Sequence, residues 1–113
     1  MKNSFIGRLL ISALAVIVTS YILPGVYLSG FFSAIIVALV LSFLNTIVKP
    51  ILVVLTIPVT ILTLGLFLLV INAILIMLAG SIVPGFEVSG FGTALLFSLI
   101  LSFINYLLGS ENL

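Results

Sequence analysis

The sequence ILPGVYLSGF, residues 22–31, decides the fold because it recurs sixty residues later as IVPGFEVSGF, residues 82–91. The likeness continues into the apolar segments that follow, and 12 of the 27 aligned pairs between residues 22–48 and 82–108 are identical. The identities include Pro, Gly, Ser and Asn as well as common apolar residues. The chain therefore contains an internal repeat, whose unit is a helix, a short loop and a second helix.

The composition places these helices in a membrane. Hydrophobic residues make up 65% of the 113 residues and charged residues only 4%, whereas a soluble domain has roughly 25% charged residues. Five charges cannot cover a water-exposed surface, which excludes a soluble globular protein, and the abundance of apolar residues excludes a disordered one. The remaining class is an integral membrane protein, with the lipid bilayer as its partner. A net charge of +1 also excludes the basic patch of a nucleic-acid-binding protein.

The apolar runs predict four transmembrane helices, because a bilayer core takes roughly 20 residues per crossing. We expect spans near residues 5–23, 31–48, 62–80 and 91–108. Residues that end helices separate these runs: Pro24, Gly25, Pro84, Gly85, Pro50 and Pro58. In the two PG loops, apolar residues alternate at Val26, Leu28, Phe86 and Val88, which predicts short extended segments, and Ser29 and Ser89 are expected to cap the helices that follow.

The resulting fold is an all-α integral membrane protein of two tandem helical hairpins in a single domain, residues 1–113. Repeat one covers about 5–48, an apolar linker about 49–61, repeat two about 62–108 and a polar tail 109–113. Pro50 to Gly80 is too short for two crossings with a turn, which would take roughly 40 residues. We therefore favour a linker that is re-entrant or lies at the interface, and a parallel pseudo-twofold axis along the membrane normal. A linker that crosses would instead give inverted repeats, as in several transporter folds.

The basic residues predict the orientation. In the four-helix arrangement Lys2, Arg8 and Lys49 share one face, so the positive-inside rule places both termini in the cytoplasm of a bacterial inner membrane. Glu87 and the two PG loops then face outward.

Small residues recur at every fourth position on two of the helices, so each set shares one helix face. We expect these stripes to form the close contact between the hairpins, because small residues let helices approach in lipid. An interface between copies in a homo-oligomer is the alternative. The residues are Ala34, Ala38 and Ser42 on one helix, and Ala94, Ser98 and Ser102 on the other.

Polar residues within the apolar runs need partners in hydrocarbon. Asn45 and Asn105 are equivalent positions of the repeat, and Asn72 in the third helix is equivalent to Ser12 in the first. We interpret them as residues that join helices by hydrogen bonds, the alternative being a polar path or an oligomer contact. Asn72 is expected to face the interior and to bond Ser12, a backbone carbonyl or a water.

Catalytic chemistry is not expected. The chain has no His and no Cys, the usual ligands of zinc, haem and iron–sulfur clusters, so no metal or cofactor is predicted. Its only carboxylates, Glu87 and Glu111, fall in a loop and in the tail, where no base and nucleophile converge. The absence of ionisable residues at mid-membrane also disfavours a proton-coupled carrier.

Two stretches resemble a known family. NTIVKPIL at residues 45–52, followed by TIPVTILTLGLF at 56–67, resembles the central signature of the bacterial phage holin family of superfamily IV type, YvlD-like small membrane proteins. PGFEVSGF at 84–91 is similar to that family's second PGF loop. The resemblance implies a four-helix holin-like protein and brings no catalytic residues with it.

Three functions compete at this point. The first is a small inner-membrane protein of structural or interaction type, acting in envelope homeostasis with a protein partner that the sequence does not identify. The second is a holin-like pore formed by oligomerisation. The third is a channel, carrier or lipid-handling protein for neutral or lipidic substrates, which a polar groove or a continuous polar lumen would favour.

Overall fold

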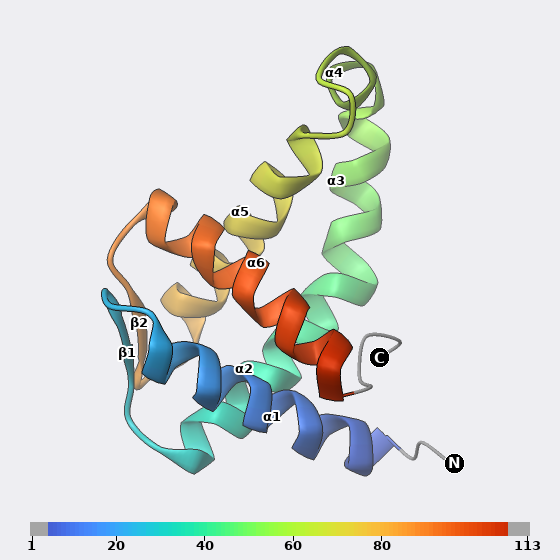
Figure 1. Cartoon of the computed structure of the whole chain (residues 1–113). Coiled ribbons are helices and arrows are strands. Elements are labelled where there is room, and N and C mark those ends of the chain that lie inside the picture. Colours follow the sequence, from blue (N-terminus) through green and yellow to red (C-terminus); the bar gives the residue numbers. More distant parts are fainter. Residues whose placement is uncertain (1–4, 109–113) are drawn as a thin grey trace.

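The computed structural model describes residues 5–108, which form two helical hairpins joined by a helical linker (Figure 1). Lys2, Glu111 and the tail at 109–113 lie outside the described residues. The elements follow in the order α1 (Phe5–Ile22), β1 (Val26–Leu28), α2 (Phe31–Phe43), η1 (Leu44–Val48), α3 (Lys49–Leu55), α4 (Ile57–Leu62), α5 (Phe67–Ile82), β2 (Phe86–Val88) and α6 (Phe91–Leu108).

Three helical segments are long and apolar enough to cross a membrane, and they are Phe5–Ile22, Phe31–Leu55 and Phe91–Leu108. The fourth apolar helix, α5, has 16 residues. At 1.5 Å per residue α5 extends about 24 Å, slightly less than the bilayer core of about 30 Å. The prediction of a mostly helical membrane protein is therefore confirmed, with three to four apolar helices.

The helices pack in a closed ring. Within the hairpins α1 packs on α2 and α5 on α6, and between the hairpins α1 packs on α6 and α2 on α5. Alanines at these contacts have no exposed surface, among them Ala13, Ala15, Ala34, Ala73, Ala79 and Ala94. Small side chains let the helix backbones approach closely, which replaces the hydrophobic driving force that lipid does not provide.

The two PG loops are joined by an antiparallel strand pair at one end of the bundle (Figure 1). The register is Val26↔Val88, Tyr27↔Glu87 and Leu28↔Phe86. Two more backbone bonds flank it: Ser29 N–H donates to the Gly85 carbonyl at 2.7 Å, and Ser89 N–H donates to the Gly25 carbonyl at 2.8 Å. The alternation of apolar residues correctly predicts the extended segments, but each loop alone gives no signal that it pairs with the other.

The glycines of the PG loops are required by the pairing. Gly25 has φ 93° and Gly85 has φ 85°, a region that side chains other than glycine rarely adopt. A Cβ on Gly25 would lie 2.7 Å from the Ser89 hydroxyl, and one on Gly85 would overlap the hydroxyls of Ser29 and Ser33. Each loop therefore needs both the positive φ and the missing side chain.

The prediction that Ser29 caps α2 is wrong. Gly30 is the N-cap residue and no side chain caps this helix. The Ser29 hydroxyl instead bonds the Ser33 hydroxyl, while its backbone N–H goes to the opposite loop. Ser89 likewise bonds Thr93 at 2.8 Å. α2 begins at Phe31 and α6 at Phe91. Ser29 and Ser89 therefore each lie one residue before the position directly preceding the helix, where a capping residue would stand.

The helix that begins at Phe31 does not end at Lys49-Pro50 as predicted. It passes through η1, a π-helical turn in which the Lys49 N–H donates to the Leu44 carbonyl five residues back. Pro50 then sits in the first turn of α3, where its missing N–H costs no bond and the wider π turn relieves the clash of its ring with the preceding turn. Pro58 occupies the first turn of α4 in the same way.

The linker is thus helical, and it leaves the bundle. The chain changes direction after η1, so that α3 and α4 project beyond the ring of helices before α5 returns (Figure 1). Neither α3 nor α4 has a buried residue. The linker therefore contributes little to the core of a single chain.

Candidate functional site: a polar chamber between the hairpins

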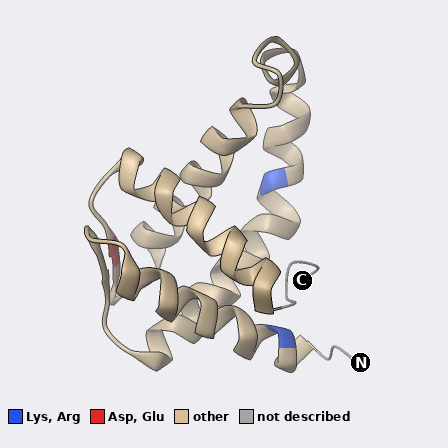
Figure 2. Cartoon of the chain, viewed as in Figure 1, with Lys and Arg blue, Asp and Glu red and all other residues tan. Residues whose placement is uncertain are grey.

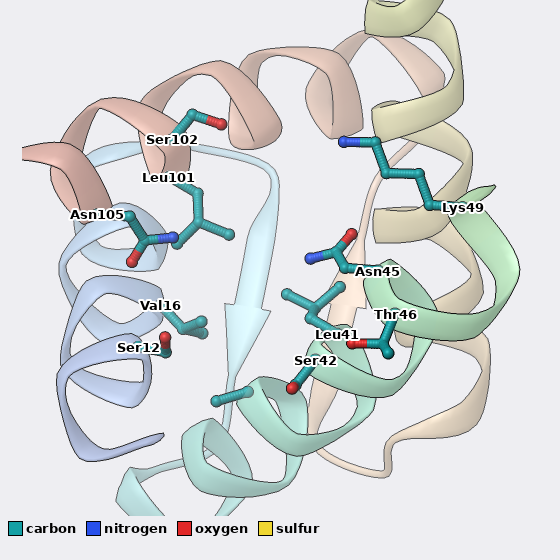
Figure 3. A pocket seen from close by; sticks show the side chains of 11 residues that line it. Ser12, Val16, Leu41, Ser42, Asn45, Thr46, Lys49, Leu101, Ser102 and Asn105 are labelled. Carbon is teal, nitrogen blue, oxygen red and sulfur yellow. The ribbon is translucent and has the colours of Figure 1, made fainter. Parts of the chain in front are cut away.

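A half-enclosed polar chamber lies between α1, the α2–η1 segment and α6, at the bundle end remote from the strand pair (Figure 3). Its volume is about 320 Å³. Its lining combines hydroxyls, amides, one ammonium group and a few apolar side chains, and consists of Ser12, Val16, Ala38, Leu41, Ser42, Asn45, Thr46, Lys49, Leu101, Ser102 and Asn105.

Much of this lining comes in pairs that are sixty residues apart. Leu41, Ser42 and Asn45 on α2 and η1 face Leu101, Ser102 and Asn105 on α6 across the chamber (Figure 3). Each helix brings these residues to one side because positions three and four apart share a helix face. The chamber is thus bounded on opposite sides by equivalent segments of the repeat.

Ser12 is the most enclosed polar residue of the lining. Its side chain is only 5% exposed, and its Oγ has no hydrogen-bond partner in the described protein. A buried hydroxyl without a partner costs about 1–3 kcal/mol, and the Ser12 Oγ itself has almost no accessible surface. The volume of about 320 Å³ suffices for roughly ten waters, since each takes about 30 Å³ in the liquid.

The charge of the chamber is positive. Lys49 extends into the space between η1 and α6, and the Asn45 amide points toward the same space (Figure 3). Among residues 5–108, no carboxylate lines the chamber. The carboxylate within residues 5–108 is Glu87, which lies in the strand pair at the other end of the bundle (Figure 2). The chamber therefore presents hydrogen-bond donors and a cation to whatever occupies it.

The small-residue stripes divide between the core and this chamber. Ala34 and Ala94 are fully buried, and Ala38 and Ser98 nearly so. Ser42 and Ser102 are more exposed and line the chamber. The expectation that the two stripes pack on each other needs correction, because α2 and α6 are diagonal in the ring and are not in extensive contact. The chamber lies between the C-terminal parts of α2 and α6, which carry Ser42 and Ser102.

Asn72 lies elsewhere. It is half-buried on α5 and does not line the chamber. Since α1 and α5 are also diagonal in the ring, the expected hydrogen bond between Asn72 and Ser12 does not form. Asn45 and Asn105, in contrast, both line the chamber. The repeat relates Ser12 to Asn72 by sequence position, but it places them on helices that are not in extensive contact.

Lys49 and Thr46 are the polar lining residues that the sequence interpretation did not predict as part of a site, because Lys49 served only as a marker of orientation. A signal was present: Asn45 and Lys49 are four residues apart, which places them on about the same side of a helix. This spacing alone does not predict a site, because the chamber also needs α6 on its opposite side. The position of α6 is known only from the fold.

The inner wall of the chamber is partly apolar. Val16, Ala38 and Leu101 are buried members of the lining. Phe86 and Phe97 are fully buried, and their rings meet edge to face with centroids 5.5 Å apart, a favourable aromatic geometry. The described residues thus form a half-enclosed chamber and, at the strand pair, a closely packed aromatic contact.

Chemically, this arrangement can bind and orient a polar group. The described residues include no group of three His, Cys, Asp or Glu that could hold a metal ion. Within the described part of the chain, the lining provides no carboxylate that could serve its hydroxyls as a general base. Recognition of a ligand is what the lining supports best.

The fold and the chamber define a small multi-pass helical membrane protein. The chain belongs to the family described as "Mycobacterial 4 TMS phage holin, superfamily IV", whose model matches residues 3–107. This confirms the resemblance seen in the central KPIL and TLGLF stretches.

Two relatives cover nearly the whole chain. The "Uncharacterized membrane protein YvlD" of Bacillus subtilis is 46% identical over 101 residues, covering 88% of this chain and 85% of the relative. The "Uncharacterized protein SCO3922" of Streptomyces coelicolor is 39% identical over 120 residues, covering 97% of this chain and 95% of the relative. No solved structure matches the chain.

Proposed function

We propose that the protein is a small bacterial inner-membrane protein of structural or interaction type, acting in envelope homeostasis, and that one chain alone does not form a pore. The observation that supports this most is the end of the bundle at the strand pair, where the fully buried Phe86 and Phe97 side chains pack against each other. The role proposed for the protein requires no catalysis.

The proposal includes the arrangement of the repeats. Repeat one would span about 5–48 and repeat two about 62–108, related by a parallel pseudo-twofold axis between Tyr27 and Glu87. Three features support it: the antiparallel register is centred on this pair, the two flanking backbone bonds join equivalent atoms, and both PG loops lie at one end. Inverted repeats would place Tyr27 and Glu87 on opposite membrane faces.

The orientation is proposed as cytoplasmic for both termini. Arg8 and Lys49 lie toward the bundle end remote from Glu87 (Figure 2), and cytoplasmic loops carry the excess of basic residues. The linker at 49–61, without a buried residue in α3 or α4, then lies along the cytoplasmic side.

Two other functions keep specific support. Membership of a holin family supports an oligomeric pore, in which several copies would enclose a lumen that one chain lacks. The polar chamber supports a lipid-handling protein, because a half-enclosed donor-rich site at the end of a helical bundle suits the polar part of a lipid better than it suits an apolar substrate.

Induced expression in a bacterial host separates these functions. We expect growth to continue and a membrane-impermeant dye to stay outside, because the bundle end is closed. Growth arrest with dye entry soon after induction would reject the proposal in favour of the oligomeric pore. The variant Phe97→Ala, which opens space under the strand pair, serves as a control: a leak confined to this variant would mean that the closed end, and not low expression, keeps the protein non-conducting.

A further inference from the structure

We propose that the polar chamber binds a phosphate group, such as the phosphodiester of an anionic phospholipid, with Lys49 as its charged contact, Asn45 as an amide donor and Ser12 at its inner wall. This inference goes beyond a structural role and does not depend on it. It rests on four observations about the chamber: its charge, its enclosed hydroxyl, its position and its size.

The charge selects an anion. Lys49 brings a positive charge and three donors, and the described part of the chain places no carboxylate on the lining. A cationic ligand would meet the ammonium without compensation, whereas phosphate oxygens accept hydrogen bonds from the ammonium, amide and hydroxyl groups that converge there. The hydroxyls of Ser42 and Thr46, on the same side as Lys49 (Figure 3), add donors of the right kind.

Ser12 is a buried polar residue at the inner wall of the chamber. The side chain is 5% exposed, and its Oγ bonds no protein atom in the described chain. Thr19, in contrast, donates its hydroxyl to the Ala15 carbonyl of its own helix at 2.7 Å. The Ser12 Oγ has almost no accessible surface, so it reaches a phosphate oxygen only when its side chain turns toward the chamber.

The position suits a lipid. Asn45, Thr46 and Ser102 are exposed members of the lining, so the chamber is open near the helix ends. Lipid phosphates lie just outside the hydrocarbon core, and basic pockets between transmembrane helices on the cytoplasmic side bind lipid headgroups. Next to the lining, Phe43 and Phe103 are each 60% exposed and give acyl chains an apolar surface.

The size agrees with this occupant. A volume of about 320 Å³ is at the lower end of the range of about 300–1,000 Å³ for small-molecule sites. It accepts a headgroup while leaving the acyl chains outside along the bundle.

The test uses the full chain in a neutral detergent and three probes. Phosphatidylglycerol carries the phosphodiester, diacylglycerol has the same chains without phosphate, and inorganic phosphate has no chains. Native mass spectrometry counts bound lipid, and circular dichroism follows melting. We expect one phosphatidylglycerol per chain to be retained after diacylglycerol is lost, with a higher melting temperature.

Matched variants identify the site. Lys49→Gln is expected to weaken phosphatidylglycerol binding about tenfold, while Lys49→Arg retains it. Arg8→Gln removes the same charge from the same end of the bundle outside the chamber lining, and should leave the affinity nearly unchanged. Ser12→Ala should not lower the melting temperature of the lipid-free protein, because the hydroxyl it removes has no protein partner to lose, and a severalfold weaker binding in this variant would show that Ser12 turns toward the ligand.

Each outcome of these measurements supports or overturns the proposed binding of a phosphate group. Competition by inorganic phosphate at the same site would support phosphate recognition, and equal stabilisation by phosphate and by the lipid would identify free phosphate as the source. Equal binding of diacylglycerol and phosphatidylglycerol would overturn the proposal. So would an Arg8→Gln effect as large as that of Lys49→Gln, because charge attraction to the whole bundle end would then explain the binding.

Discussion

Gly65 and Gly85 share a positive φ but differ in their surroundings. Gly65, in the turn between α4 and α5, has φ 89° and no atom within 4 Å of the place that a Cβ would take. At Gly85 the same Cβ would overlap the Ser29 and Ser33 hydroxyls. The two positions therefore separate backbone strain from steric overlap.

We expect Gly85→Ala to destabilise the protein more than Gly65→Ala. The strain of a left-handed alanine costs about 1 kcal/mol at either site, and the overlap adds about 1–3 kcal/mol at Gly85. Thermal melting in detergent by circular dichroism measures both. Equal losses in the two variants would mean that Ser29 and Ser33 rotate away freely and that the loop contact is loose.

Individual polar residues show where sequence reasoning succeeds and fails. Asn45 and Asn105 could be singled out because an amide in an apolar run needs a partner, and both line the chamber. Ser12 could be chosen as well, but its partner could not, because equivalent positions of a repeat need not be neighbours. Lys49 was not predicted as a site residue, because its charge was used only to predict the orientation of the chain.

Among the elements, α1 and α6 match the expected spans, whereas α5 (Phe67–Ile82) begins five residues later than the expected span 62–80, and the linker was not predicted to be helical. Apolar length alone gives α1 and α6 to within a residue or two of the expected spans 5–23 and 91–108. The extension of the second helix through Pro50 depends on the π turn at Leu44–Val48, which no sequence pattern specifies. Proline in the first turn is compatible with a helix. Pro50 alone therefore does not show whether the preceding helix ends there or continues with a bend.

The stripe on α2 allows a matched packing test. Ala34 has no exposed surface and lies in the core, whereas Ala38, one turn later, lines the chamber. We expect Ala34→Leu to lower stability by about 1–3 kcal/mol, because a closed helix contact cannot accept extra methylenes. Ala38→Leu should cost less, because its side chain can enter the chamber.

Chemical or thermal unfolding in detergent gives the comparison between the two leucine variants. A larger loss for Ala38→Leu than for Ala34→Leu would mean that the chamber is smaller in the membrane than its volume of about 320 Å³ indicates. The same Ala38→Leu protein should also bind less phosphatidylglycerol, because leucine occupies ligand space.

The two similar hairpins pack so that α2 and α6, which lie diagonally across the ring, are not in extensive contact. α1 packs on α6 and α2 on α5, so the equivalent helices α2 and α6 end up across from each other with the chamber between them. The sequence reveals that two similar hairpins exist, because the repeat is visible. It does not reveal which helices touch, since small residues on every helix suit several packings.

The strand pair offers the decisive test of how the hairpins are related. Tyr27 and Glu87 lie directly opposite in the antiparallel register, where residues are about 4.5–5.5 Å apart at Cα, within the range that a disulfide spans. The chain has no native cysteine, so the double variant Tyr27→Cys with Glu87→Cys is free of competing thiols. We expect it to form an intramolecular disulfide under mild oxidation.

The control pair Val26→Cys with Phe86→Cys has the same loops and the same separation in sequence, but Val26 lies opposite Val88 and Phe86 opposite Leu28. We expect cross-linking to be much slower in this offset pair, because diagonal neighbours in a sheet are about 7–8 Å apart. Mass spectrometry of the digested monomer band distinguishes the intramolecular bond from a dimer. A membrane-impermeant thiol reagent, applied to each single variant in intact cells, should reach positions 27 and 87 from the same side. Labelling from opposite sides, with no cross-link in the 27–87 pair, would contradict the parallel arrangement and would require inverted repeats.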